Sequence, residues 1–513
     1  MLNRKNYDVA ITGAGVIGCS IALGLSRLGY KVCVIDRNHD AGAGTTSYSS
    51  GVCRTMYSIL DSVRFSWEGY QYWSEWQDFL GIKDSRGYAK LREPGAVFLK
   101  TNNSKSFLNK CTSCLKQANI PYEEWDLQQS KDYLEKYQWD INHSYNPKRI
   151  NDIAFGIPVE YSIEGAVFFP KTGYVSDPQL AAQNLCLAGQ LNNSNSNNNG
   201  GGVDYIFNHK VIDVSQCNGA VTGLKIVPVK PVNTNSNTNN RHNAPNTPNN
   251  NNNNTNNNNM NTNATHDIIT INAPIVVNAT GPHSQQFTSM VFSSNPITGR
   301  KEYIESDMLI GTRPLRQEVA YCDAPPPLGR SDTQLDMDLE TSNAPLTADL
   351  DIGVYFRPEI GNKYLIGSVE PDCDEHQWVD GDIDDLDTNL SDNWTNYIYR
   401  AALRIPNLPI PTSRNSMGIV STYDVTPDWT PIYDKSNLKG YYMAIGTSGN
   451  QFKNAGIVGE LMAKLIDSCE NGQNHDKNPV LFETKRTNPG QYVNLNSFSR
   501  LRVLNDTSGS VMG

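Results

Sequence analysis

The chain has 513 residues, a formal net charge of −10, and no apolar run near the roughly 20 residues needed to span a bilayer. This length is enough for two or three domains with proper cores. The negative charge argues against nucleic acid or an anionic membrane as the main partner. We therefore expect no nucleic-acid partner and no membrane span.

Residues 7–36 predict a strand, a tight turn, a helix and a second strand. Gly13 permits the turn, Gly15 lets a pyrophosphate approach the backbone, and Gly18 lets the helix lie close to the strand. The N-terminus of the helix then faces the phosphates, where its unpaired N–H groups favour an anion. Asp36 is placed to accept hydrogen bonds from an unphosphorylated ribose, which favours FAD or NAD over NADP. The motif alone does not distinguish FAD from NAD.

A run of small and hydroxylated residues follows, from Ala41 to Arg54. It is too polar for a core element, and its N–H and hydroxyl groups can line the phosphates and ring edge of a ligand. The next segment, Ser62 to Leu80, carries Phe65, Tyr72, Trp76 and Phe79 at helical spacing, which predicts a helix with a buried aromatic face.

The middle of the chain alternates between helices and strands. We predict strands at 95–99 and 165–170, helices at 105–118 and 178–188 (the latter with Asp177 as N-cap), and a strand pair at 205–214 and 220–229. Asparagine-rich tracts occupy 192–199 and about 231–265. The second tract has almost no apolar side chains to offset ordering entropy, so we expect a disordered insertion in a hairpin loop.

Three further groups of elements complete the chain. Strands at 268–274 and 275–278 lead into the turn Ala279-Thr280-Gly281. Strands at 313–321, 353–358 and 365–367 predict an antiparallel sheet that forms the floor of a second domain. A strand at 441–445, a glycine-bearing turn at 446–455 and a helix to about Ile466 follow.

The ten cysteines lie mostly in apolar segments, as Cys19, Cys33 and Cys322 do, and read as small buried side chains. Cys111 and Cys114 form the one close pair, which we assign to a surface helix. We expect neither a disulfide framework nor a metal site.

Together these segments resemble the D-amino-acid oxidase superfamily of FAD-dependent oxidoreductases, and within it the branch of sarcosine oxidase and dimethylglycine dehydrogenase. The resemblance rests on the glycines with Asp36, the Gly44–Arg54 loop, the strand ending in Asn278-Ala279-Thr280-Gly281, and Gly446–Lys453. It implies non-covalent FAD rather than NAD. It also implies an α/β fold, with a Rossmann-like FAD-binding domain of the glutathione-reductase type and an interleaved α+β substrate domain that contains a mostly antiparallel sheet.

The resemblance also divides the chain. The FAD-binding domain is expected at 1–60, 165–230, 266–295 and 412–470, the substrate domain at 61–164 and 296–411, the insertion at 231–265, and a C-terminal extension at 471–513. The implied FAD-binding residues are Gly13, Gly15, Val16, Ile17, Gly18, Asp36, Thr45, Thr46, Ser47, Ser50, Gly51, Arg54, Val211, Ala279, Thr280, Gly281, Gly446, Ser448, Gly449, Asn450, Gln451, Phe452 and Lys453.

In such enzymes a hydride passes from the substrate C–H bond to flavin N5, and the protein positions the amine. By resemblance Lys453 pairs with the substrate carboxylate, Arg54 lies near the flavin ring, and Tyr355 lines the pocket. The implied substrate is a small secondary or N-methylated amino acid. The electron acceptor is oxygen or an electron-transfer protein.

Three positions depart from the sarcosine oxidase pattern. Ser421 stands where those enzymes attach FAD through a cysteine. Tyr57 stands where they carry a second arginine for the carboxylate, and Leu365 stands where they carry an oxygen-activating lysine. Since a cation beside the flavin stabilises developing negative charge, its loss favours a dehydrogenase over an oxidase.

Two other functions stay open: a non-catalytic flavoprotein scaffold that acts in assembly of a respiratory complex, and an oxidase of a hydroxy acid or polyamine. The glycine motif begins close to Met1, which leaves no room for a leader peptide ahead of it. We therefore expect a cytoplasmic protein.

Overall fold

The computed structural model describes residues 4–192, 201–229, 268–295, 298–301, 303–325, 343–507 and 509–512. The insertion predicted at 231–265 lies outside these residues, as does the first asparagine-rich tract beyond Asn192. Within the described residues, no helix is both long and apolar enough to cross a membrane.

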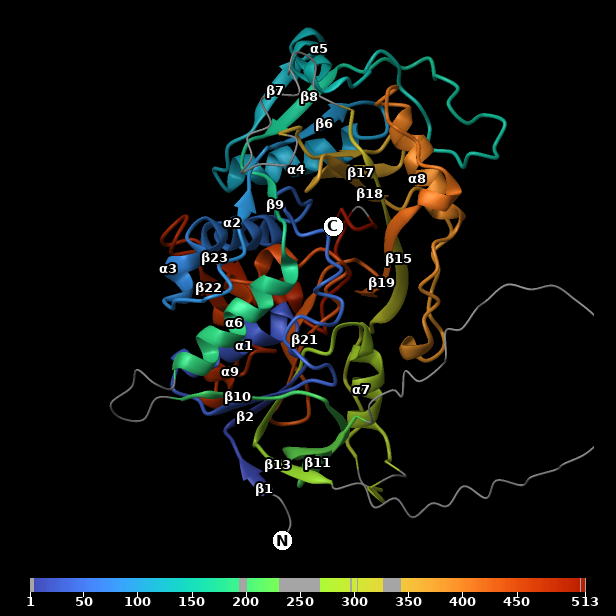
Figure 1. Ribbon diagram of the computed structural model, residues 1–513. Helices are drawn as coiled ribbons and strands as arrows, with labels where there is room; N and C mark the ends of the chain where they lie inside the picture. Colours follow the sequence, from blue (N-terminus) through green and yellow to red (C-terminus); the bar gives the residue numbers. More distant parts are fainter. Residues whose placement is uncertain are drawn as a thin grey trace, which may run out of the picture.

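A six-stranded sheet in the order β10-β3-β2-β14-β21-β20 forms the centre of the FAD-binding part, in the lower half of Figure 1. Neighbouring strands are parallel except β20 and β21. Four of the strands are buried along their whole length, which explains their continuous apolar sequence. The strands are β2 (Val9–Thr12), β3 (Val32–Ile35), β10 (Val203–Ile206), β14 (Ile275–Asn278), β20 (Ile432–Lys435) and β21 (Tyr441–Ile445).

Three helices from distant parts of the chain pack side by side on this sheet: α1 (Val16–Arg27), α6 (Pro178–Asn192) and α9 (Ile457–Glu470). Figure 1 draws them in blue, green and red. Where α1 crosses α9, a Cβ atom on Gly24 would lie 2.3 Å from the carbonyl oxygen of Gly459, so the crossing requires glycine. At the start of α6 the Asp177 carboxylate accepts from the Leu180 N–H at 2.9 Å, which confirms the predicted cap.

A four-stranded sheet, β1-β13-β12-β11, lies below the first. It contains β1 (Arg4–Asn6), β11 (His209–Cys217), β12 (Ala220–Pro228) and β13 (Ile269–Asn272). The single strand predicted at 205–214 was wrong, because β10 ends at Ile206 in the six-stranded sheet and β11 begins at His209 in this one. Asn208 between them has a left-handed φ of 56°, which turns the chain from one sheet into the other.

The substrate part contains a five-stranded antiparallel sheet, β16-β17-β18-β15-β19, in the upper half of Figure 1. The strands are β15 (Arg313–Asp323), β16 (Thr347–Asp349), β17 (Val354–Glu359), β18 (Lys363–Ser368) and β19 (Met417–Val425). Helix α8 (Asp392–Ala402) packs its apolar face on this sheet. The predicted fold class is therefore confirmed.

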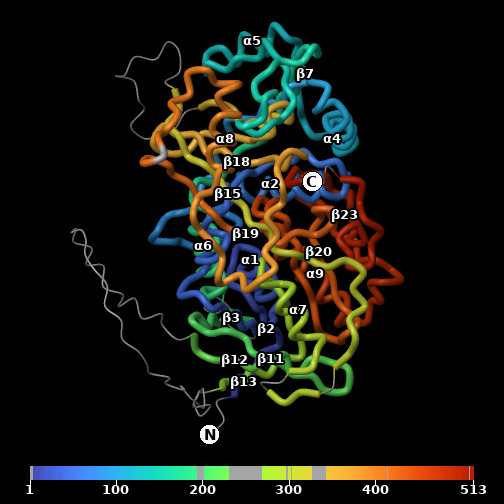
Figure 2. Tube along the Cα trace, turned by 90° about the vertical axis from the view of Figure 1, so that its right-hand side faces the viewer, coloured from blue at the N-terminus to red at the C-terminus, as the bar shows by residue number. Residues whose placement is uncertain are grey.

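Smaller sheets and helices cover the rest of the substrate part, and Figure 2 shows α4 and α5 on its outer surface. These elements are β4 (Val52–Cys53), β5 (Leu91–Arg92), β6 (Ala96–Lys100), α4 (Lys105–Gln117), β7 (Glu123–Asp126), α5 (Leu127–Leu134), β8 (Gly165–Phe169) and β9 (Gly173–Val175). Outside it lie α7 (Ser284–Phe292), β22 (Leu481–Glu483) and β23 (Tyr492–Asn494).

The helix predicted at 62–80 is two helices, α2 (Leu60–Ser74) and α3 (Trp76–Leu80). The chain leaves helical geometry at Glu75, with φ −118° and ψ 29°. The predicted aromatic face is buried, in the same hydrophobic cluster as α1, α6 and α9. These helices therefore pack against the FAD-binding part. The two parts described here follow the sheets and differ from the predicted domain limits at α2, α3, β4, β8, β9 and β19, and those limits remain a prediction.

Candidate active site

The glycine-rich turn before α1 is shaped by contacts that only glycine allows. Gly13 has φ +106°, and a Cβ atom there would lie 2.2 Å from the carbonyl oxygen of Ala279. A Cβ on Gly18 would lie 1.9 Å from the Gly13 carbonyl oxygen. A Cβ on Gly15 would meet only Thr46 Oγ1, at 3.2 Å. Gly13 and Gly18 thus hold the turn together, while Gly15 presents the open side that a pyrophosphate can approach.

The end of α1 beside this turn suits a negatively charged group. Gly15, the N-cap, has no side chain, and no acidic residue lies in the first turn. The Val16 N–H donates to Thr46 Oγ1 at 3.1 Å. Asp36 accepts from the N–H groups of Ala14 at 2.6 Å and Asn38 at 2.7 Å, and each carboxylate oxygen keeps further acceptor capacity for a ribose hydroxyl. These residues fit the phosphates and adenosine ribose of a dinucleotide.

Other residues predicted to bind the phosphates and adenosine of the dinucleotide lie on segments beside the glycine turn and Asp36. Thr280 and Gly281 follow β14, and a Cβ on Gly281 would lie 3.8 Å from Thr45 Oγ1. Ser47 closes its own loop by donating to the Gly44 carbonyl oxygen at 2.8 Å. Val211 lies on β11, two residues after His209, whose N–H donates to the Asp36 carbonyl oxygen at 3.0 Å.

A cavity lies where the FAD-binding and substrate parts meet. The three residues predicted to form the catalytic site, Arg54, Tyr355 and Lys453, all line it, although they are far apart in sequence. Its wall is largely apolar. It also includes Ser49, Ser50, Val52, Met56, Ala96, Phe98, Thr172, Leu346, Thr347, Ala348, Phe356, Tyr423, Gly449, Asn450, Phe452, Val511 and Met512.

The turn after β21 brings Lys453 to this cavity, on the short 3₁₀ helix Phe452–Asn454. Gly446 and Ser448 lie beneath the turn: the Gly446 N–H donates to the Asp424 carboxylate at 2.6 Å, and Ser448 has φ 48°. Burial raises the pKa of Asp424 to about 7. The buried Gln451 accepts from the Tyr433 hydroxyl at 3.1 Å. Of the predicted turn residues, those that line the cavity are Gly449, Asn450, Phe452 and Lys453.

Lys453 and Arg54 both contact Tyr57. Lys453 Nζ donates to Tyr57 Oη at 2.8 Å and to the Asn450 carbonyl oxygen at 2.6 Å. The Arg54 guanidinium stacks over the Tyr57 ring, 4.2 Å from its centroid. Burial, together with the positive charge of Arg54, holds the pKa of Lys453 well below its usual value. Tyr57, which replaces the second arginine of the sarcosine oxidase pattern, therefore contacts Lys453 through its hydroxyl.

The two cations differ from the other buried arginines. Arg54 is 7% exposed and Lys453 is 4% exposed, and neither has a carboxylate partner within 4.0 Å among the described residues. In contrast, every other buried arginine pairs with at least one carboxylate: Arg357, Arg400, Arg404, Arg500 and Arg502. Buried charges are normally paired, whereas these two side chains contact only neutral oxygen atoms among the contacts of the described residues.

Leu365 and Ser421 are the other two positions that differ from the sarcosine oxidase pattern, and the structure shows which residues lie beside them. Leu365 on β18 is buried and lies opposite Arg357 on β17. Arg357 donates from Nε to the Ser50 carbonyl oxygen at 2.7 Å, so a cation does reach the Gly44–Arg54 loop. Ser421 lies on β19, and it is Tyr423, two residues later, that lines the cavity.

Sequence reasoning missed several pocket residues. Arg357 does not line the cavity but contacts the carbonyl oxygen of Ser50, which does, and it was detectable because it lies two residues after Tyr355 and so shares its face of the strand. Met56 and Phe98 carry only an apolar signal, which does not distinguish a pocket wall from a core. Val511 and Met512 belong to the C-terminal extension, for which the sequence predicted no role.

A family model described as FAD dependent oxidoreductase (DAO) matches residues 8–465. The chain therefore belongs to the DAO family of FAD-dependent oxidoreductases, and its cofactor is FAD. The glycine turn, Asp36 and the cavity provide a fitting site.

Solved structures share this fold at low sequence identity. L-proline dehydrogenase from P. horikoshii is 16% identical with a TM-score of 0.61, covering 91% of this chain and 94% of that one. Glycine oxidase from Geobacillus kaustophilus is 18% identical with a TM-score of 0.59, covering 98% and 100%. Iminodiacetate oxidase from Chelativorans sp. BNC1 is 14% identical with a TM-score of 0.54, covering 94% and 98%.

A curated relative, glycerol 3-phosphate dehydrogenase from Caloramator mitchellensis, is 47% identical over 51 residues. That match covers 10% of this chain and 11% of the relative. It is thus a local similarity that does not extend to the whole protein.

Proposed function

We propose that this protein oxidises the C–N bond of a small amino acid, with a secondary or N-methylated amine as the preferred substrate. Bound FAD would supply the hydride acceptor for this chemistry. The observation that carries the proposal is the pair of buried cations, Arg54 and Lys453, in one largely apolar cavity without a carboxylate partner among the described residues.

These residues can recognise an amino acid by its carboxylate. Arg54 offers a planar set of donors that matches a carboxylate, and Lys453 offers a point charge. An incoming carboxylate would reduce the electrostatic repulsion between the two cations. It would also favour protonation of Lys453 Nζ, whose pKa is lowered while the site lacks an anion.

The rest of the wall suits the carbon skeleton and the amine. Phe98, Met56 and Phe452 exclude water from the side of the substrate, which favours the neutral amine needed for oxidation. Desolvation raises the pKa of Tyr355 to about 12, so its phenol remains protonated and can donate a hydrogen bond. We assign Tyr355 to orienting the substrate.

The names of similar structures support this class of substrate, because proline, glycine and iminodiacetate all carry an amine and a carboxylate. The electron acceptor is proposed to be oxygen or an electron-transfer protein. Leu365, which stands where an oxidase would carry a lysine, favours an electron-transfer protein. Arg357 lies opposite Leu365 and favours oxygen through its positive charge, which Glu359 at 2.9 Å offsets in part.

Steady-state kinetics of Lys453→Ala test the carboxylate role. We expect KM to rise sharply for every amino acid that the wild type oxidises, with FAD still bound, because Lys453 lies in the substrate cavity and not at the glycine turn. Unchanged KM values on all these substrates would show that the role assigned to Lys453 is wrong.

A further inference from the structure

Two residues of the C-terminal extension lie at the cavity described above. Val511 and Met512 contribute to its wall, and Met512 is 4% exposed. The Met512 side chain packs in an apolar cluster with Met56 and Phe98. The C-terminal extension, drawn in red in Figure 1, thus returns to the space between the two parts of the molecule.

This segment occupies the donors of Arg54. Arg54 Nη2 donates to the carbonyl oxygens of Val511 at 2.9 Å and Met512 at 2.6 Å, and Nη1 donates to the Met56 carbonyl oxygen. Two adjacent carbonyl oxygens on one nitrogen of a guanidinium stand where a carboxylate would bind. Val511 is also held through its N–H, which donates to Glu370 Oε2 at 3.0 Å.

The extension before this segment is fixed to the loop beside the cavity. Arg502 forms a two-pronged ion pair with Asp428, at 2.9 Å and 2.8 Å. Asp428 also accepts from the Asn505 N–H at 3.0 Å and, through its carbonyl oxygen, from Thr507 Oγ1 at 2.9 Å. The next residue of that loop, Trp429, accepts from the cavity residue Asn450 at 3.2 Å.

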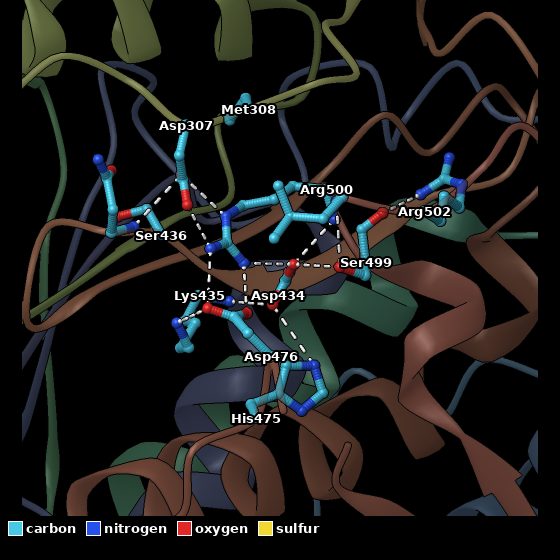
Figure 3. Close-up of polar contacts among 12 residues, drawn as sticks. Asp307, Met308, Asp434, Lys435, Ser436, His475, Asp476, Ser499, Arg500 and Arg502 are labelled. Carbon is cyan, nitrogen blue, oxygen red and sulfur yellow. Dashed lines mark hydrogen bonds and ion pairs between the residues drawn. The ribbon is translucent and has the colours of Figure 1, made fainter. Parts of the chain in front are cut away.

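A second and deeper anchor precedes it (Figure 3). Arg500 is fully buried, and its guanidinium contacts Asp307 at 2.5 Å, Asp434 at 3.0 Å and Asp476 at 2.9 Å. The Arg500 N–H also donates to Asp434 at 2.8 Å. The extension therefore has a firmly bound root, residues 499–507, and a short tip, Gly509–Met512, with fewer polar contacts.

We propose that the tip Gly509–Met512 is an intramolecular occupant of the carboxylate end of the pocket, and that it must leave Arg54 before a carboxylate ligand binds there. The inference rests on the proposed function in one respect: it takes Arg54 as part of the anion site. A carboxylate can bind only to molecules in which the tip is out of the pocket. The apparent dissociation constant is therefore the intrinsic one divided by the fraction of such molecules.

Acetate binding to the FAD-loaded protein tests this inference, followed by the change in the visible absorbance of the flavin. The full chain is compared with a chain that ends at Thr507, which keeps both anchors. We expect the dissociation constant for acetate to fall about tenfold or more on shortening. Arg54→Gln in the shortened chain should abolish the gain, because it removes the guanidinium for which the tip competes.

Two single substitutions complete the comparison. Met512→Lys places a positive charge in the apolar cluster beside Arg54 and Lys453 and should expel the tip from an otherwise complete chain, with a similar gain in acetate affinity. Val503→Ala, at a 90% exposed position of the same extension, should leave the dissociation constant unchanged. Equal acetate affinity in the full, shortened and Met512→Lys proteins would overturn the inference, as would a lack of acetate binding by all three.

The two proposals can fail separately. If the shortened protein binds acetate no more tightly yet its flavin is reduced by an amino acid, the tip inference is wrong and the function stands. If acetate binding tightens through Arg54 yet no amino acid reduces the flavin, the tip inference stands and the proposed substrate class is wrong.

Discussion

Lys453 Nζ lies 2.8 Å from Tyr57 Oη, and the same Tyr57 ring supports the guanidinium of Arg54. The neutral tyrosine holds two buried cations in place without neutralising either. Because both side chains have neutral oxygen partners here, the charge of Arg54 is not offset, and Lys453 can take up a proton when an anion binds. This arrangement is the physical basis of the proposed carboxylate site.

Carboxylate binding should be accompanied by proton uptake. Burial lowers the pKa of Lys453 well below its usual value, and a bound carboxylate would raise it again, so between these two pKa values the complex holds more protons than the free protein. Calorimetric titration of acetate in buffers of different ionisation enthalpy measures this uptake. Lys453→Met should abolish it, whereas Tyr57→Phe should retain it. Acetate binding without uptake in the wild type would contradict the lowered pKa.

Substitutions at two glycines of the first turn should have different effects, one on folding and the other on FAD binding. Gly18→Ala should unfold or strongly destabilise the apoprotein, because its Cβ would lie 1.9 Å from a carbonyl oxygen. Gly15→Ala should fold and yet bind FAD about tenfold or more weakly, since its Cβ projects to the open side. Thermal unfolding of the apoprotein and FAD titration measure the two effects.

Gly311→Ala is the matched control, because a Cβ there meets nothing within 4 Å. It should change neither stability nor FAD affinity. If Gly15→Ala bound FAD as the wild type does, the pyrophosphate would not approach at this turn.

Protonation of the buried His475 should destabilise the fold in acid. The buried His475 accepts from the Val480 N–H through Nδ1 at 3.0 Å and faces Asp434 through Nε2 at 3.5 Å, next to Arg500, Lys435 and Asp476 (Figure 3). Burial lowers its pKa below 6.5, so in the interval beneath 6.5 the unfolded chain binds a proton that the folded chain does not.

The contribution of His475 to the free energy of unfolding should therefore hold above pH 6.5 and fall as the pH decreases through 6.5 towards the lowered pKa. Asp424, whose pKa burial raises to about 7, contributes in the opposite direction, so the difference between wild type and a His475 variant isolates the histidine. Denaturant unfolding at a series of pH values measures this slope. His475→Gln should reduce it, and His143→Gln, at an exposed position, should not. Identical slopes for wild type and His475→Gln would show that another group causes the acid sensitivity.

Local sequence rules predicted the FAD-binding part well, because its signals are local. Glycines at fixed spacing, the N-cap Asp177 and fully apolar strands each report on their own neighbourhood. The same rules failed at Asn208 and Glu75, where the apolar pattern runs on through a single residue that breaks the element. Whether a break occurs there depends on which sheet or helix the next residues join, and that is decided by tertiary packing.

The candidate site was predictable where the family motif carried it, as at Arg54, Tyr355 and Lys453. It was not predictable where residues meet across strands or from the end of the chain. Arg357 reaches the Gly44–Arg54 loop from a position opposite Leu365, and Val511 reaches Arg54 across 457 positions of sequence. No local pattern encodes such contacts, since they follow from the register of a sheet and from the anchors of the extension.

The most direct test of the proposed function is anaerobic reduction of the bound flavin. The purified FAD-loaded protein is mixed, without oxygen, with a panel of secondary and N-methylated amino acids, and the loss of its visible absorbance is followed before and after air is admitted. We predict bleaching by at least one of these amino acids, with rapid recovery in air for an oxidase and slow recovery for a dehydrogenase. A fully loaded flavin that no amino acid of the panel bleaches would contradict the proposed function.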